Sequence, residues 1–194
     1  MSTVAATPRT GVVLADLLPA TRTRDIALVA GGAVLTGLAA QIAVPVPGSP
    51  VPVTGQTFAA LLVGTALGAR RGFLSLAVYT LVGMAGVPWF ADGKSGPGGA
   101  SFGYVLGMLL AATVVGELAR RGGDRSVLRT AGTMVVGSAV IYAVGVPYLA
   151  MSAGLSLSAA VAAGLVPFLL GDALKAALAM GALPTTWKLI GRRD

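Results

Sequence analysis

The chain contains no cysteine and no histidine. It can therefore form no disulfide or thiolate site, and it lacks the commonest metal ligand and proton carrier of proteins. Only 7 of its 194 residues are acidic, and they are scattered along the chain. We expect no metal, no cofactor and no enzymatic activity, because a membrane enzyme such as a lipid-phosphate transferase generally needs clustered acids to hold a metal.

Charge is scarce in general, since 11% of the residues are charged and 55% are hydrophobic, with a mean hydropathy of +0.84. This composition is typical of an integral membrane protein. Asp16 interrupts a weakly apolar beginning, which argues against a signal peptide. We expect a cytoplasmic tail over 1–25, a six-helix membrane domain over 26–190 and a second cytoplasmic tail over 191–194.

Six apolar stretches predict six membrane-spanning helices in an all-α protein, over residues 26–44, 58–69, 73–87, 102–119, 130–151 and 167–187. Residues 152–164 predict a further short helix at the interface. Twelve of the 14 Lys and Arg residues fall on one side of this topology, while Lys94 lies on the other and Lys175 within a span. The positive-inside rule then places both termini in the cytoplasm. Basic residues placed as topological anchors give no reason to expect nucleic acid.

A proline-rich segment precedes the second stretch, with four prolines in residues 44–52. Proline removes backbone donors and prevents helix formation, so this segment is predicted to be extended. The following apolar run has only twelve residues, so the segment could dip below the lipid headgroups. Non-helical backbone at that depth is tolerated when it is buried or lines a cavity. The segment is a candidate wall or lid of a site, with Thr54 and Gln56 as its polar groups, or else an exposed connector.

Aromatic residues mark the same outer side of the predicted topology. Trp89 opens a glycine-rich loop that extends to Ala100, and Tyr148 lies near the outer end of the fifth span. Trp89 fits either an interfacial aromatic belt or a stacking position in a pocket. We expect both residues to join the proline-rich segment around one external pocket.

Asp172 and Lys175 form the one acid-base pair embedded in apolar sequence. Their three-residue spacing places them on one face of a helix, whose first turn would contain Pro167. Ionisable groups within a membrane are costly and usually face a cavity or one another. The pair therefore indicates either a ligand site or an internal ion pair that joins two helices.

Small residues recur at four-residue spacing in the first span. Ala27 and Gly31 form one such pair, and Ala33 and Gly37 form another. This spacing lets a second helix approach closely. It fits either packing inside the bundle or the docking of a separate membrane protein.

Three separated motifs resemble the BioY family, the biotin-binding S component of energy-coupling-factor (ECF) vitamin transporters. They are the run over 50–72, the Phe-Gly-Tyr that ends at Tyr104, and Pro-Phe-Leu-Leu-Gly-Asp-Ala-Leu-Lys over 167–175. The resemblance implies a six-helix protein of the cell membrane that captures biotin from outside. It also implies a transmembrane T component and two ATP-binding subunits as partners, since this chain has no phosphate-binding loop of the Walker type.

The resemblance implies roles for individual residues. Asp172 and Lys175 become polar anchors of biotin, Tyr104 lines its pocket, and the small residues of the first span become a docking face for the T component. Two alternatives stay open. One is an S component for another vitamin, and the other is a carrier that works alone and is coupled to protons through Asp172.

Overall fold

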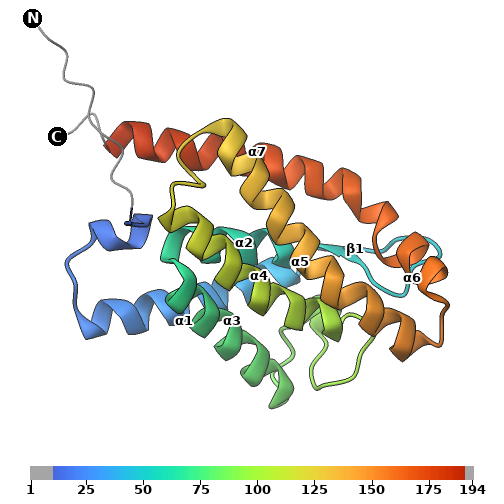
Figure 1. Ribbon diagram of the computed structural model, residues 1–194. Helices are drawn as coiled ribbons and strands as arrows, with labels where there is room; N and C mark the ends of the chain where they lie inside the picture. Colours follow the sequence, from blue (N-terminus) through green and yellow to red (C-terminus); the bar gives the residue numbers. More distant parts are fainter. Residues whose placement is uncertain (1–10, 191–194) are drawn as a thin grey trace, which may run out of the picture.

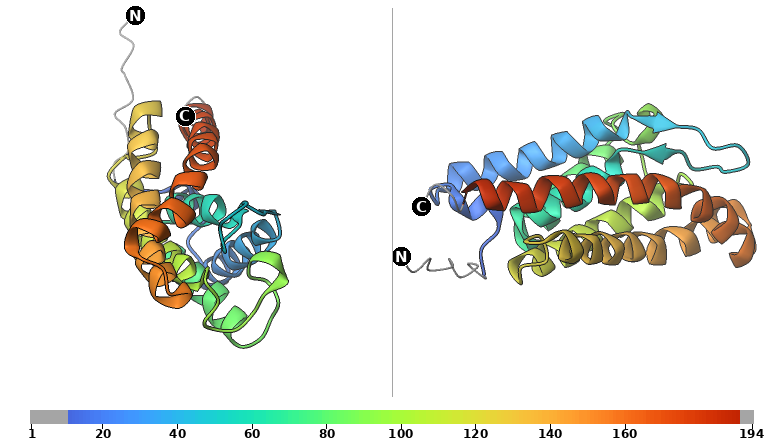
Figure 2. Two further views of the ribbon diagram at one scale, coloured as in Figure 1. Left: turned by 90° about the vertical axis from the view of Figure 1, so that its right-hand side faces the viewer. Right: turned by 90° about the horizontal axis from the view of Figure 1, so that it is seen from above.

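The computed structural model describes residues 11–190, and the parts of the two predicted tails at 1–10 and 191–194 lie outside it. Seven helices are present among the described residues: α1 (Arg22–Ala40), α2 (Gln56–Leu67), α3 (Ala69–Met84), α4 (Phe102–Arg120), α5 (Val127–Ala153), α6 (Leu157–Gly164) and α7 (Leu169–Ile190). Short elements connect them: η1 (Leu14–Leu17), β1 (Ala43–Val44), β2 (Val53–Thr54), η2 (Ala91–Gly93) and η3 (Val166–Phe168). The six long helices run along the bundle, and α6 lies at one end (Figures 1 and 2).

These six long helices coincide with the six apolar stretches, so the predicted all-α membrane bundle is confirmed. Within residues 11–190, four helical stretches have the length and composition to cross a membrane, namely α1, α4, α5 and the run from α6 through α7. Helix α2 has 12 residues and α3 has 16. At 1.5 Å per residue α2 is about 18 Å long, which is shorter than the hydrocarbon core of a bilayer. Neighbouring helices and the adjoining strands therefore have to cover the remaining thickness.

Most helix boundaries differ from the sequence prediction by a few residues, as at the start of α3, which begins at Ala69 and not at residue 73. Helix α1 starts at Arg22, where the Thr21 side chain accepts a hydrogen bond from the Arg24 N–H, so 22–25 are helical. Pro167 lies in η3, one turn before α7 begins. The described part of the expected N-terminal tail also packs on the bundle, because Val13 and Ala15 are buried.

Helix α4 forms the centre of the bundle. Its Met108, Ala111, Ala112 and Val115 side chains are fully buried, and the helix packs on α2, α3 and α5. Glycine permits these close approaches: a methyl group at Gly107 would lie 2.7 Å from the Ile141 carbonyl oxygen of α5. Contact between backbones at small residues is the usual way in which membrane helices associate.

The proline-rich segment is extended, as its four prolines predicted, and its two ends pair as an antiparallel ribbon. Ala43 pairs with Thr54, and Val44 pairs with Val53. Val51 and Thr54 are buried, while the ribbon's tip extends from the bundle (Figure 2). The segment is therefore part of the packed structure at its β2 end and not merely an exposed connector.

The opposite end of the bundle, which we call the basic end, brings together η1, the α2–α3 turn, the α4–α5 loop and the end of α7. The Gly11 N–H donates to the Arg120 carbonyl at 2.8 Å. Trp187 Nε1 donates to Asp124 Oδ2 at 2.6 Å, and the Arg125 guanidinium lies 3.3 Å from the Trp187 ring centroid. Burial raises the pKa of Asp124, although the Trp187 and Arg125 contacts favour its carboxylate. These contacts fasten α7 to the α4–α5 loop.

We predict that Trp187→Phe lowers the melting temperature of the detergent-solubilised protein. The substitution keeps an aromatic ring under Arg125 but removes a hydrogen bond to a charged group, which is worth about 1.5–3 kcal/mol. Differential scanning fluorimetry measures the change, with Leu189→Ala as a control because Leu189 is exposed on the same helix. Equal melting of Trp187→Phe and wild type would show that this bond does not hold α7.

Candidate binding site

A small cavity lies toward the ribbon end of the bundle, at the start of α2, α4 and α7 and beside α5. Its volume is about 20 Å³, room for about one water molecule. The lining residues come from β2, α2, α4, α5, η3 and α7 and from the segment before β2: Val51, Pro52, Thr54, Gln56, Thr57, Tyr104, Ser138, Ile141, Tyr142, Phe168, Asp172 and Lys175.

The predicted acid-base pair lies at the α7 wall of this cavity. Lys175 Nζ is 3.2 Å from Asp172 Oδ1, and both side chains are more than four-fifths buried. Lys175 Nζ also donates to Thr57 Oγ1 at 2.7 Å, and the Tyr142 hydroxyl donates to Asp172 Oδ2. Hydrogen bonds from two other helices thus satisfy a charge pair in apolar surroundings, which is the condition under which such a pair persists.

Tyr104 contributes an aromatic wall. Its hydroxyl donates to the Gly164 carbonyl at 2.7 Å, which ties α4 to the end of α6. Its ring lies 6.4 Å from that of Phe168 with the planes inclined by 29°, and meets Tyr142 edge-on at 6.3 Å. The hydroxyl already has a partner, so Tyr104 presents an apolar surface to the cavity.

Three polar groups at the cavity have no hydrogen-bond partner within residues 11–190. They are Gln56 Nε2, Thr54 Oγ1 and Ser138 Oγ. Gln56 uses its Oε1 to accept from the Tyr79 hydroxyl at 2.8 Å, which fixes the orientation of the amide and leaves its two N–H donors free. The cavity therefore offers both donors and acceptors beside a charged pair.

Two predicted site residues, Trp89 and Tyr148, do not line the cavity. Trp89 Nε1 donates to the Tyr79 carbonyl at 2.9 Å, and its ring lies against Gly37 of α1. Tyr148 packs on Gly103 and lies edge-on to the Phe102 ring at 6.1 Å. Both residues fill contacts between helices, and Trp89 reaches the cavity only indirectly, through Tyr79 and Gln56.

The structure adds three polar residues that the sequence analysis missed, namely Thr57, Ser138 and Tyr142. Ser138 and Tyr142 are four residues apart and share one face of α5. A stripe of polar residues on one face of an otherwise apolar span is the sequence signal that could have identified Ser138 and Tyr142. Thr57 follows Gln56 directly, and its hydroxyl reaches Lys175 on α7, a long-range contact that the sequence alone does not specify.

The small residues of α1 divide into two sets. Ala27 and Gly31 are exposed, and a methyl group at Gly31 would meet nothing within 4 Å. Ala33 is buried, and Gly37 contacts the Trp89 ring. The expected exposed face therefore excludes Ala33 and Gly37, which pack inside the bundle.

The bundle of apolar helices and its enclosed polar cavity place the chain among multi-pass membrane proteins. A solved structure described as the S component for biotin from an ECF-type ABC transporter has the same fold, with a TM-score of 0.75 and 21% identity over 88% of this chain and 95% of that chain. This likeness identifies the architecture as that of an S component.

The BioY family model matches residues 10–192, so the chain belongs to the BioY family. The "Probable biotin transporter BioY" of Pyrococcus horikoshii is 35% identical over 82% of this chain and 93% of its own length. The "Biotin transporter BioY" of Rhizobium etli is 32% identical over 81% of this chain and 89% of its own.

We expect Lys175→Met to destabilise the protein without ligand more than the double substitution Asp172→Asn, Lys175→Met does. The single change strands a buried carboxylate, at about 3–5 kcal/mol, and the double change removes both charges. Thermal melting in detergent measures both, with Lys188→Met as a control on an exposed lysine of α7. A double variant less stable than either single variant would show that the two residues do not neutralise one another.

Proposed function

We propose that the chain captures biotin at the cavity around Asp172 and Lys175, as the substrate-binding component of an ECF-type transporter. The observation that carries the proposal is the combination of a buried charge pair and three unpartnered polar groups in one cavity between membrane helices. Relatives named biotin transporters over four-fifths of the chain supply the ligand. The chain is thus a transport protein and not an enzyme.

The cavity's chemistry suits biotin. Its ureido group has two N–H donors and one carbonyl acceptor, next to an apolar bicycle and a carboxylate-bearing tail. The Asp172 carboxylate can accept from N–H donors, and the Lys175 ammonium or the Gln56 amide can donate to a carbonyl or carboxylate. The Tyr104 and Phe168 rings offer an apolar surface for the bicycle.

Binding requires the cavity to widen, because ligand pockets usually measure about 300–1,000 Å³. The ribbon carries Val51, Pro52 and Thr54 of the lining, so its displacement would open the cavity. A groove of about 550 Å³ already separates the ribbon's tip, residues 47–50, from α6 and its flanks. We infer that the ribbon serves as the lid and moves toward this groove.

The orientation follows from charge. The basic end holds Arg70, Arg71, Arg120 and the α4–α5 loop, and Lys94 lies at the ribbon end. Under the positive-inside rule the basic end faces the cytoplasm. The cavity and its lid then face the outside of the cell, where the vitamin is captured.

We expect the purified protein to bind one biotin per chain and to prefer it to thiamine and riboflavin. Isothermal titration calorimetry with the three vitamins measures the preference. Tighter binding of another vitamin would favour the alternative S component and contradict the biotin assignment.

The variants of the charge pair test the site itself. Asp172→Asn and Lys175→Met should each weaken biotin binding by about 1.5–3 kcal/mol, the worth of a hydrogen bond to a charged group. The double variant should regain stability but not affinity, and Lys188→Met should bind normally. Recovery of affinity in the double variant would place the ligand elsewhere.

Partners of the S-component type, a T component and two ATP-binding subunits, would supply the energy. Gly31 and Ala27 on the exposed face of α1 are the proposed docking surface. Gly31→Trp should therefore leave biotin affinity unchanged and abolish uptake energised by coexpressed subunits. Gly132→Trp is the matched control, because Gly132 is also exposed and also has nothing within 4 Å of an added methyl group.

Uptake measured with and without the energising subunits also tests the carrier alternative. Uptake by the chain alone that depends on a proton gradient would favour a stand-alone carrier. Survival of energised uptake in Gly31→Trp would instead remove this face from the interface.

A further inference from the structure

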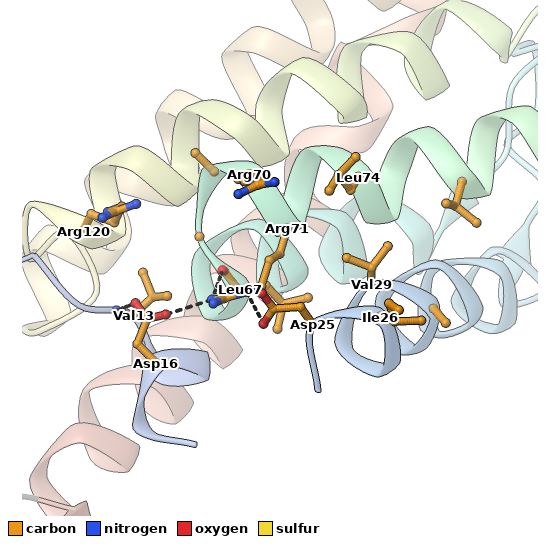
Figure 3. Close-up of a pocket in the computed structure, with 14 residues that line it drawn as sticks. Val13, Asp16, Asp25, Ile26, Val29, Leu67, Arg70, Arg71, Leu74 and Arg120 are labelled. Carbon is orange, nitrogen blue, oxygen red and sulfur yellow. Dashed lines mark hydrogen bonds and ion pairs between the residues drawn. The ribbon is translucent and has the colours of Figure 1, made fainter. Parts of the chain in front are cut away.

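A separate hollow, larger than the cavity around Asp172, lies at the basic end, on the outside of the bundle between α1 and α3 (Figure 3). It is a groove of about 580 Å³, and it shares no lining residue with the cavity around Asp172. Its lining is charged at the basic end and apolar along the helices: Val13, Asp16, Asp25, Ile26, Val29, Ala30, Leu67, Gly68, Ala69, Arg70, Arg71, Leu74, Val78 and Arg120.

The charged end of the groove has an excess of cations. Arg71 bridges two carboxylates, with Nη1 2.8 Å from Asp16 Oδ1 and Nε 3.0 Å from Asp25 Oδ1. Figure 3 shows this bridge across the groove, with Arg70 and Arg120 beyond it. Within residues 11–190, the side chains of Arg70 and Arg120 make no hydrogen bond or ion pair. Arg120 is close enough to Asp16 to help lower the pKa of that carboxyl, but neither its guanidinium nor that of Arg70 is held by a hydrogen bond, so both can turn toward an anion.

The walls of the groove are apolar and open to the surroundings. Ile26 is 70% exposed, Leu74 41% and Val78 36%. Ile26 lies on α1, which is long and apolar enough to cross a membrane, and Leu74 and Val78 lie on the neighbouring α3. From Arg70 to Val78 the α3 wall rises about 12 Å at 1.5 Å per residue. One leaflet of the hydrocarbon core is about 15 Å thick, so the groove runs nearly one leaflet deep.

We propose that this groove binds one anionic phospholipid of the leaflet at the basic end. The phosphate of phosphatidylglycerol meets Arg70 and Arg120, and an acyl chain lies along Ile26, Leu74 and Val78. The charge at the mouth, three guanidiniums against two carboxylates, favours an anionic headgroup over a zwitterionic one. Basic pockets between membrane helices are suited to such headgroups, and Arg forms paired hydrogen bonds with phosphate.

Native mass spectrometry of the full chain, released from detergent with palmitoyl-oleoyl phosphatidylglycerol or the matching phosphatidylethanolamine, tests this site. We expect one phosphatidylglycerol to be retained in preference to phosphatidylethanolamine. Each of Arg70→Gln and Arg120→Gln should reduce the preference about fivefold, from about 1 kcal/mol for each arginine near an anionic lipid. Leu74→Trp fills the apolar wall and should reduce the retention of both lipids.

The double variant Arg121→Gln, Arg129→Gln is the matched control. It removes the same charge from exposed arginines at the same end, and neither residue lines the groove. Equal retention of the two lipids by wild type, or an equal loss of preference in this control, would overturn the proposal. The proposal would also be overturned if the double variant Arg70→Gln, Arg120→Gln kept its lipid preference but lost association with a coexpressed T component. The groove would then be a protein interface. Unchanged melting and biotin binding confirm that each variant is folded.

Discussion

Close approach of helix backbones around α4 is the contact on which the rest of the structure depends. Gly64 of α2 and Gly107 of α4 leave no room for a side chain, and Ala111, Ala112 and Val115 fill the narrow spaces that result. In lipid there is little hydrophobic gain from bringing helices together, so dense packing at small residues supplies the cohesion. Because α4 is held from several sides, it offers Tyr104 as a fixed wall for the cavity.

The polar site is built between this rigid centre and a less embedded helix. Helix α7 contacts mainly α5, and its Leu170, Leu174 and Leu178 side chains are exposed. Asp172 and Lys175 face inward, where Tyr142 of α5 and Thr57 of α2 meet them. The site therefore lies beside a helix with few packing partners and is closed mainly by side-chain hydrogen bonds, which suits a pocket that must open for a ligand.

Much of the fold and part of the site could be predicted from the sequence, because these features are set by residues that are close together in the chain. Apolar run length located the helices, the prolines of 44–52 excluded helix there, and three-residue spacing placed Asp172 beside Lys175. The rotation of α5 about its axis is not local. The Ser138 and Tyr142 spacing marks one polar face of α5, but apolar residues occupy the other faces, so the sequence does not specify which neighbouring helix that polar face meets.

Small and aromatic residues were ambiguous for a related reason. Ala33 and Gly37 have the same spacing as Ala27 and Gly31, and the neighbours met in the fold, such as the Trp89 ring against Gly37, decide which pair is covered. The position of Trp89 is fixed in turn by its hydrogen bond to the Tyr79 carbonyl on α3 and by contact with the Tyr79 ring. Such contacts are set by tertiary packing, and residue type alone does not specify them.

The hydrogen bond from Lys175 to Thr57 joins α7 directly to α2, two helices that otherwise touch little. A ligand that displaces the Thr57 hydroxyl from this ammonium would become the link between the helices. The separation of α2 and α7 would then be set by the size of the bound molecule. Occupancy of the site would thereby be converted into a mechanical displacement along the whole length of α7, as far as the end of the bundle where Trp187 is anchored.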